Sequence, residues 1–381
     1  MAKKITPQSV EPLASLPTVG RILLKATLLF VLLNVAFALT DPMSFLGRIG
    51  IYNWLVPGRE RITYDNGSQQ SHTVTTANLS ADLSTHAVAG AYPPDEFRVF
   101  VFGDSATWAP TQQSDQTVTA FLNNMELRTT DNRHLRFYNL AYPGSSAAKT
   151  LLLMDAAMDY QPDLIVWLLT PGAFYYGKVH HYLVTQNPAA MARLSAEYHL
   201  PGFSVDDGQF VDPDVWDKTI IGRRDELATL LRLQVYGIAW GLTRIDNTRE
   251  SYFEPPLNDI LGDMEDPAPF NPDDATLQYL YAMVDLAGDV PIVFINEPIF
   301  IADGKNSDRW YNASYSRQEF DSFRVIMSAI AAREGWNYQD AWNVVPPQYF
   351  TKDELHRNPE GEIRFAAYLA PTFVELAEQQ R

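Results

Sequence analysis

The sequence predicts a doubly wound α/β/α sandwich, in which a parallel β-sheet lies between two layers of helices. Short apolar runs of about four to eight residues alternate with longer stretches of helical spacing, which is typical of right-handed βαβ units. The short runs are rich in Val, Ile, Leu and Phe and are apolar on both faces, as strands covered on both sides should be. The predicted strands are 97–102, 135–140, 163–169 and 290–295, and the predicted helices are 147–160, 276–287, 317–334 and 361–378.

The composition is that of a globular protein, with 46% hydrophobic and 20% charged residues among 381. A formal net charge of −17 makes the surface as a whole repel phosphate groups, which argues against nucleic acid as a partner. The chain has no cysteine, which excludes disulfides, thiolate metal sites and cysteine nucleophiles. We find no internal repeat.

Residues 22–39 form an apolar run with only three polar interruptions. A helix of this length reaches the lower limit for spanning a bilayer core, and the basic residues before it favour a cytoplasmic segment 1–21 with the rest of the chain outside. We therefore expect a membrane signal anchor at 22–39 and an extracytoplasmic domain in the cell envelope. The alternatives are a signal peptide cut after Ala38 and a buried helix of a soluble domain.

Residues 40–94 contain a Pro-Gly pair and a Ser/Thr/Asn-rich stretch, which predict a connector with little regular structure. The main domain then covers 95–381. Within it, 176–275 is too long for an ordinary crossover between the third and fourth strands and is predicted to be an insertion. Its apolar stretch 227–242 is too short to span a bilayer, and it fits a cap over a pocket, a helix on the membrane surface or a helix packed on the sheet.

The strongest local motif is Gly103-Asp104-Ser105, at the end of the first predicted strand. The carboxyl edge of an open α/β sheet is where ligands bind, and the helix that follows offers free N–H groups to an oxyanion. Ser105 is therefore a candidate nucleophile, and Asp104 is a candidate for holding the loop or contacting substrate. The same three residues also fit an ordinary turn with a capping serine.

A second motif, Asp353-Glu-Leu-His356, lies near the C-terminus, just before the last predicted helix. A carboxylate three residues before a histidine can accept the Nδ1 proton and leave Nε2 free to take a proton from a serine. If the predicted topology holds, this loop and the Ser105 loop meet at one edge of the sheet. The sequence thus predicts a base, His356, with its orienting acid, Asp353.

Together with Gly144 after the second predicted strand, these motifs resemble the SGNH/GDSL hydrolases over about residues 95–378. The resemblance implies a flavodoxin-like sandwich that acts on esters without a metal or organic cofactor. It implies Ser105 as nucleophile, His356 as base, Asp353 as its orienter, and an oxyanion hole that contains the Ser105 and Gly144 N–H groups.

One position departs from that family. Its usual Gly-x-Asn-Asp after the third strand is replaced here by residues 168–172, so no asparagine is present as the third oxyanion donor. The alternatives are the Thr170 hydroxyl as a replacement donor and an oxyanion hole that rests on two backbone groups. The loss of one donor typically costs about two to three orders of magnitude in rate. Asn296 and Glu297, at the end of the fourth strand, are candidate substrate-binding residues, although the same pair also fits a plain turn.

Membrane-tethered relatives, including alginate O-acetyltransferase-like proteins, are similar in layout. The resemblance therefore implies an esterase or O-acyltransferase that acts on acylated cell-envelope carbohydrate, with a membrane-bound acyltransferase as a candidate partner. A non-catalytic protein that binds glycan or an assembly partner is the first alternative. A lipase or phospholipase that uses 227–242 as an interfacial lid is the second.

Aromatic residues at the same edge are compatible with stacking on sugar rings, although core packing explains most such residues in any protein. The candidates are Trp108, Tyr142, Phe174, Tyr175, Tyr176, Trp310 and Tyr311. The pair His180-His181 lacks a partner at helical spacing, so we expect solvated side chains there and no metal site.

Overall fold

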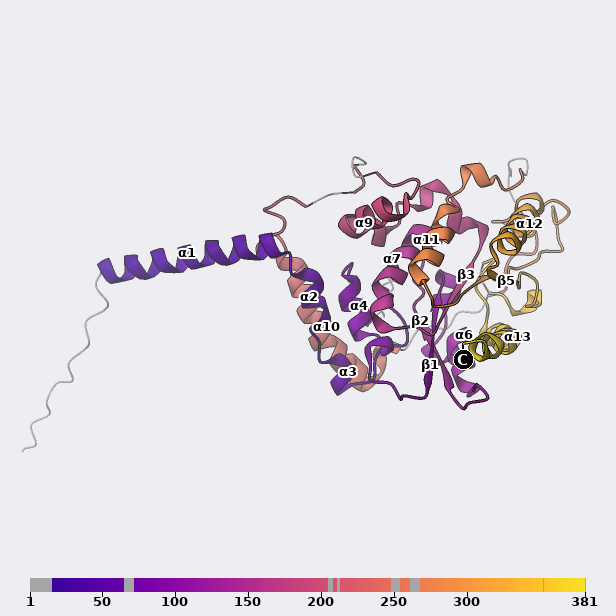
Figure 1. The fold of residues 1–381 in the computed structure, drawn as a ribbon, viewed down its shortest axis with the longest axis horizontal. Coiled ribbons are helices and arrows are strands. Elements are labelled where there is room, and N and C mark those ends of the chain that lie inside the picture. The colour runs from indigo at the N-terminus through magenta and orange to yellow at the C-terminus, as the bar shows by residue number, and fades with distance from the viewer. Residues whose placement is uncertain are drawn as a thin grey trace, which may run out of the picture. The chain divides into compact units, whose positions relative to one another are not determined.

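An open sheet of five parallel strands forms the centre of the fold, with helices on both faces (Figure 1). The computed structural model describes residues 16–64, 72–204, 208–210, 213–247, 254–260, 268–351 and 353–380. The chain divides into two compact units, one of Met1–Pro42 and Pro213–Ala228 and the other of Met43–Asp212 and Thr229–Arg381. The sheet belongs to the second unit.

The sheet has the order β2-β1-β3-β4-β5, and every neighbouring pair is parallel. This is the flavodoxin-like order, so the predicted fold class is confirmed. The strands are β1 (Glu96–Phe102), β2 (His134–Asn139), β3 (Leu164–Leu169), β4 (Ile292–Asn296) and β5 (Asn337–Asp340). The first four match the predicted strands, and β5 is an additional short edge strand.

The two faces of the sheet bury separate hydrophobic cores. One core packs the sheet against α4 (Leu79–Thr85), α7 (Ala147–Ala157), α11 (Gln278–Ala287) and α12 (Arg317–Glu334). The other packs it against α6 (Val118–Asn124) and α13 (Pro359–Glu378). Alternate side chains of the inner strands enter opposite cores, which explains why β1, β3 and β4 carry apolar residues on both faces.

Residues 43–94 are not the irregular connector predicted from sequence. They contain α2 (Met43–Arg48), α3 (Tyr52–Leu55), α4 and η1 (Ala87–Ala89). Their apolar side chains, such as Ile62, enter the first core.

Arg61 ties this part of the chain to the helix that follows β1. Its buried guanidinium donates to the carbonyl oxygens of Trp108, Ala109 and Gln112 and to the Ser114 hydroxyl, at 2.7–3.2 Å. The segment before β1 is thus part of the folded domain.

Between β3 and α11, the chain is largely helical where the structure describes it. It contains η5 (Tyr176–Lys178), α8 (Tyr182–Thr185), α9 (Pro188–Tyr198), α10 (Arg224–Thr243), η6 (Ile245–Asn247) and η7 (Pro272–Asp274). The remaining short elements of the chain are α5 (Ser105–Trp108), η2 (Ser114–Gln116), η3 (Met158–Tyr160), η4 (Pro171–Phe174) and η8 (Pro347–Tyr349).

In the first unit, α1 (Leu16–Thr40) carries the apolar run predicted as an anchor. Its stretch Thr18–Thr40 is long and apolar enough to cross a membrane, and only 11% of its most apolar window is buried. The helix therefore fits a membrane anchor or a signal sequence. Within the same unit, the Ile221 N–H donates to Asn34 Oδ1 at 3.3 Å and Arg223 pairs with Asp41 at 3.6 Å.

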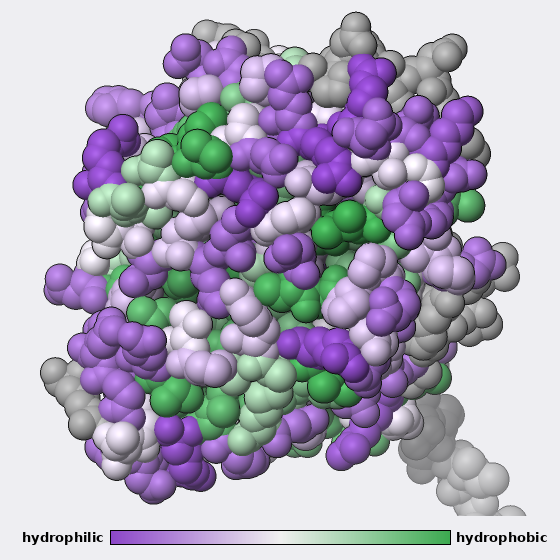
Figure 2. Space-filling model, turned by 90° about the vertical axis from the view of Figure 1, so that its right-hand side faces the viewer, coloured by the Kyte–Doolittle hydropathy of each residue, from purple (hydrophilic) through white to green (hydrophobic). Residues whose placement is uncertain are grey.

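The face of the molecule on the side of α12 and α13 is mainly hydrophilic (Figure 2). Hydrophobic residues appear on it only in small separate groups. Such scattered apolar exposure is ordinary for a soluble surface.

Candidate active site

Ser105 is the first residue of α5, directly after β1 and its two-residue turn. It therefore lies at the carboxyl edge of the sheet, as predicted. The turn needs glycine at position 103, because a Cβ there would lie 2.2 Å from Thr107 Oγ1. The Ser105 side chain is half-buried, which leaves it partly accessible at this edge.

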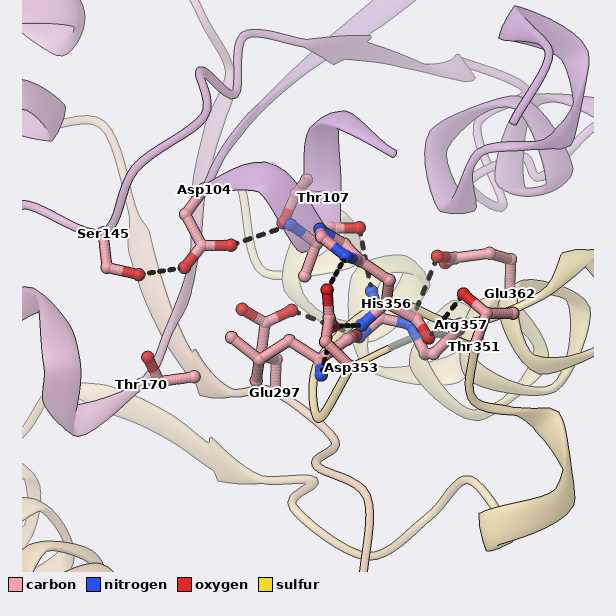
Figure 3. Close-up of polar contacts among 12 residues, drawn as sticks. Asp104, Thr107, Ser145, Thr170, Glu297, Thr351, Asp353, His356, Arg357 and Glu362 are labelled. Atoms are coloured by element: carbon pink, nitrogen blue, oxygen red, sulfur yellow. Dashed lines mark hydrogen bonds and ion pairs between the residues drawn. The ribbon is translucent and has the colours of Figure 1, made fainter. Parts of the chain in front are cut away.

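Asp104 fixes the conformation of the serine loop. Its carboxylate accepts a hydrogen bond from the Ala106 N–H at 2.8 Å and another from the Ser145 hydroxyl (Figure 3). The side chain is only 6% exposed. Of the two roles considered for Asp104, this geometry favours holding the loop over contacting substrate.

Asp353 and His356 form the predicted acid–base pair. The two side chains meet through His356 Nδ1 and Asp353 Oδ2 at 2.5 Å, and the other carboxylate oxygen accepts the N–H groups of Leu355 and His356 at 3.0 and 2.9 Å. Burial alone would raise the pKa of Asp353, but the hydrogen bonds and charge of His356 outweigh it, so the pKa is lowered. Asp353 is thus held as a carboxylate behind the imidazole.

His356 Nε2 is buried and has no hydrogen-bond partner within the part of the chain that the structure describes. Because Nδ1 faces Asp353, the neutral ring has its acceptor at Nε2. Figure 3 shows the imidazole on the side of Asp353 that faces the start of α5. A buried nitrogen without a partner is costly and is typical of a functional site.

Arg357, the residue after His356, joins the histidine loop to α5 and the chain that follows it. Arg357 donates from its guanidinium to the carbonyl oxygen of Ala106 at 3.4 Å, and its own carbonyl oxygen accepts from Gln112 Nε2 at 2.5 Å. These contacts place Ser105 and His356 on facing loops. No hydrogen bond joins their side chains in this structure, and catalytic hydrogen bonds often tighten only when substrate binds.

Two backbone N–H groups are available at this edge. Neither the Ser105 N–H nor the Gly144 N–H has an acceptor among the described residues. Glycine is required at position 144 for two reasons. Its φ is +91°, and a Cβ there would lie 2.8 Å from His181 Nε2. Both donors occupy positions that the family resemblance assigns to an oxyanion hole.

Thr170 lies at the end of β3, where the family has its asparagine. Its hydroxyl oxygen accepts a hydrogen bond from the Tyr315 hydroxyl at 3.0 Å, and both side chains are buried. Because Thr170 accepts in this bond, its own proton remains available as a donor.

Lys149 is a residue of the site that the sequence analysis missed. Its ammonium is fully buried and donates to the carbonyl oxygens of Gly103, Tyr142 and Gly144, at 2.9, 2.5 and 2.7 Å. Burial lowers the pKa of Lys149 to about 8. One cation thereby holds the Ser105 loop and the Gly144 loop together. The sequence gives no local signal for this role, because α7 also contains the polar residues Thr150 and Asp155.

Glu297 was predicted to bind substrate, but its side chain does not face the open edge of the sheet. It is fully buried and pairs with Arg357 at 3.2 Å, and Arg357 also pairs with Glu362 at 3.2 Å. Burial, with the nearby Asp104 charge, raises the pKa of Glu297 to about 8. The pair of carboxyls holds the buried arginine that follows His356, so Glu297 supports the histidine loop from beneath (Figure 3).

Asn296 is likewise fully buried rather than open to substrate. Its amide donates to Asp340 Oδ1 at 2.9 Å, which links the ends of β4 and β5. The position of Asn296 at the end of β4 therefore predicted the correct edge of the sheet, but it did not predict the direction of the side chain.

His181 is not the solvated residue that was expected. Its Nδ1 accepts from the Leu183 N–H at 3.2 Å and caps α8, and its Nε2 contacts the Pro143 carbonyl oxygen at 2.9 Å. Burial, together with the Lys149 charge, lowers the pKa of His181 to about 4. The neutral ring supports the loop that carries Gly144. Within the described ranges, no group of three or more His, Asp or Glu could hold a metal ion.

Most of the aromatic residues considered for sugar stacking are buried. The buried ones are Trp108, Tyr142, Phe174 and Tyr311, each at most 4% exposed. Tyr175 and Tyr176 are 40% and 42% exposed and lie just after η4, the turn that follows Thr170. These two remain candidates for contact with a substrate.

Two surface cavities of about 540 and 470 Å³ lie elsewhere in the second unit. The first is lined by residues of α3 and α4, including Trp54, and the second by polar residues near Arg59 and Asp246. Neither contains Ser105, Asp353 or His356, so the arrangement of side chains, rather than cavity size, identifies the candidate site.

Solved structures with a similar fold are esterases and related proteins. They include a carbohydrate acetylesterase family member from Sinorhizobium meliloti (12% identity, 74% of this chain and 98% of that one, TM-score 0.34). They also include a G-D-S-L family protein from Desulfitobacterium hafniense (11% identity, 72% of this chain and 99% of that one, TM-score 0.34). A third is an aryl esterase from M. smegmatis (14% identity, 73% of this chain and 99% of that one, TM-score 0.34).

No protein-family model and no curated protein matches the sequence.

Proposed function

We propose that this chain is a serine esterase or O-acyltransferase of the SGNH type, held at a membrane by α1. The observation that carries the proposal is the environment of the His356 imidazole. Its Nδ1 is bonded to Asp353, and its Nε2 has no partner among the described residues. Arg357 joins the loop of His356 to the helix that begins at Ser105. A base, its orienting acid and a serine at a helix start are the parts that acyl transfer requires.

In the proposed first step, Ser105 Oγ attacks the carbonyl carbon of an ester while its proton passes to His356 Nε2. The negative charge that forms on the carbonyl oxygen is stabilised by the Ser105 and Gly144 N–H groups, with the Thr170 hydroxyl as the third donor. The tetrahedral intermediate collapses, the C–O bond to the alcohol breaks, and the alcohol takes the proton from Nε2. Ser105 is left acylated.

In the second step, water or a sugar hydroxyl gives its proton to His356 Nε2 and attacks the acyl-enzyme. Collapse of the new intermediate returns the proton to Ser105 Oγ and releases an acid or a new ester. Hydrolysis and transfer therefore use the same residues and differ only in the acceptor. Each step balances without a cofactor.

We propose O-acylated carbohydrate of the cell envelope as the substrate class. The exposed Tyr175 and Tyr176 follow the turn after Thr170, and aromatic faces of this kind stack on sugar rings. An anchor before an extracytoplasmic domain would keep the site at the envelope. A membrane-bound acyltransferase is the proposed source of acyl groups if the chain transfers them.

The structure gives less support to a lipase with α10 as its lid. Helix α10 packs against α3, where Gln234 accepts from the Ile51 N–H and Gly237 faces Tyr52. A non-catalytic binding protein is the remaining alternative. It predicts that the serine is unreactive.

Reaction of the full chain in detergent with a fluorophosphonate, followed by intact mass, tests the proposal. We expect one adduct on the parent protein, none on Ser105→Ala, and one on the matched control Ser145→Ala. Cleavage of acetylated glycan by the parent would then identify the substrate class. A folded parent that takes no adduct, while a reference serine esterase reacts, would contradict the catalytic function and favour the binding protein.

A further inference from the structure

Helices α2, α3 and α10 expose large apolar side chains on one side of the second unit. Phe45, Trp54 and Val235 are 66%, 81% and 56% exposed. We call this set the α2–α3–α10 surface; its members are Phe45, Ile49, Ile51, Trp54, Leu55, Leu231, Val235 and Leu242. A cluster of this size is unusual on a soluble surface and marks a binding face.

The two parts of this surface are packed against each other. Gln234 of α10 accepts the Ile51 N–H at 3.1 Å, and the Tyr52 ring fits against Gly237 and Gly241, where a Cβ would lie 3.0 and 2.8 Å from it. Figure 1 shows the three helices together, on the side of the second unit away from α12 and α13. They form one continuous face.

The charge of this face sets it apart from the rest of the chain. Residues 43–58 and 229–245 contain no Asp or Glu, although the whole chain has 46. Their charged residues are Arg48, which pairs with Asp159, and Arg232 and Arg244. Apolar side chains flanked by arginine suit the headgroup region of a bilayer, which attracts cations and accommodates tryptophan.

Helix α2 follows the end of α1 after a short length of chain, and the start of α10 lies close in sequence to a residue that is bonded to α1. Helix α1 ends at Thr40 and α2 begins at Met43, so three residues span at most about 11 Å between them. In the first unit, the Ile221 N–H is bonded to Asn34 of α1, and α10 begins three residues later. An α1 that crosses a bilayer therefore brings both α2 and the start of α10 to its surface.

We infer that the α2–α3–α10 surface rests in the headgroup region of the lipid bilayer, as a second membrane contact. The inference rests on the proposed anchoring by α1. A peripheral contact of this kind would hold the catalytic domain in a fixed orientation instead of on a free tether.

Spin labels on single cysteines can test this contact in the full chain, because the protein has no cysteine of its own. The variants are Trp54→Cys and Val235→Cys on the surface, with Val325→Cys on α12 as the matched control at 69% exposure. Leu28→Cys on α1 reports whether the anchor is inserted. Each is reconstituted into vesicles of phosphatidylethanolamine and phosphatidylglycerol, and its accessibility to oxygen and to a water-soluble nickel chelate is measured.

We expect the labels at positions 54, 235 and 28 to favour oxygen over the nickel chelate several-fold relative to the label at 325. The inference would be overturned if the labels at positions 54 and 235 had the same accessibilities as the label at 325 while the label at 28 lay in the bilayer. That result would indicate that a protein partner covers the face. A label at 28 that is exposed to water would overturn it by removing its premise. Neither result affects the fluorophosphonate test of Ser105, so failure of the membrane contact and failure of catalysis are distinguishable.

Discussion

Arg357 donates a hydrogen bond to the carbonyl oxygen of Ala106 at 3.4 Å, and these two residues directly follow His356 and Ser105 in the chain. The proposed base and nucleophile are therefore held by a contact between a side chain and a carbonyl oxygen, one residue away from each. Since Arg357 is fully buried and paired with Glu297 and Glu362, this contact cannot move without disturbing the core. The loops are positioned before substrate arrives.

Replacing Arg357 by Met should destabilise the protein strongly. It would leave two buried carboxyls without their cation, and breaking a buried ion pair from one side typically costs about 3–5 kcal/mol. Chemical denaturation of the variant measures this loss. The triple variant Arg357→Met, Glu297→Gln, Glu362→Gln should recover part of it; no recovery would show that packing, not charge, is responsible.

Stability should fall as pH rises from about 4.5 to 8, in part because of Glu297. Burial raises its pKa from 4.5 to about 8, so the folded state holds a proton in this window that the unfolded state releases. The stabilising contribution is complete below pH 4.5 and is lost by about pH 8, with a slope of at most about 1.4 kcal/mol per pH unit.

Glu297→Gln should flatten this dependence, as measured by the free energy of unfolding between those pH values. The exposed Glu360→Gln on α13 is the matched control and should keep the parent slope. If the Glu297→Gln variant retains the slope, the dependence belongs to other groups.

Lys149→Met should lower kcat with little change in KM. Three buried carbonyl oxygens of the Ser105 and Gly144 loops lose their donor, and each unsatisfied group costs about 1–3 kcal/mol, so a melting temperature well below that of the parent is also expected. The exposed Lys178→Met is the control for loss of a positive charge. A selective rise in KM would instead indicate a role in binding substrate.

Gly144→Ala should lower kcat by about two orders of magnitude, since it displaces an oxyanion donor. The new Cβ would meet His181 Nε2 at 2.8 Å and would sit at a φ of +91°, so the loop has to shift. Gly172→Ala is the comparison, because its nearest neighbouring atom would be 3.6 Å away. Equal activity in the two variants would remove Gly144 from the proposed hole.

Thr170→Val tests the third donor without a change in shape. We expect kcat to fall by about two to three orders of magnitude, and the free energy of unfolding to fall by about 1–3 kcal/mol because the buried Tyr315 hydroxyl loses its acceptor. Tyr315→Phe, which removes only the partner of the Thr170 hydroxyl, should have a smaller effect. A kcat for Thr170→Val that stays close to the parent value would mean that the two backbone N–H groups suffice.

The sheet and the triad loops were predictable because their signals are local. Four strands are rich in apolar residues, and Asp353 and His356 lie within one loop. β5 was missed because its residues are only half-buried and polar, so no apolar run marks it. The short helices before β1 were missed because helices of four to seven residues show too little periodicity to be recognised.

The supporting residues were not predictable for a different reason. Lys149, Arg357 and Glu297 act through contacts with residues distant in sequence, such as Arg357 with Ala106. In a sequence, a charged residue that is buried in the fold cannot be told from one that lies at the surface. Glu297 was assigned to the correct edge, but only the packing of α13 beneath it shows which way it turns.

The four hydrogen bonds of Arg61 have a practical meaning for where this domain begins. A fragment cut at residue 95, the domain boundary predicted from sequence, lacks the guanidinium that holds the carbonyl oxygens at and just after the end of α5. The helix that starts at Ser105 would then lose its anchorage at the opposite end. The smallest active unit should therefore start at about residue 43, and a shorter gene product would be expected to fold poorly or to carry a serine that no longer reacts.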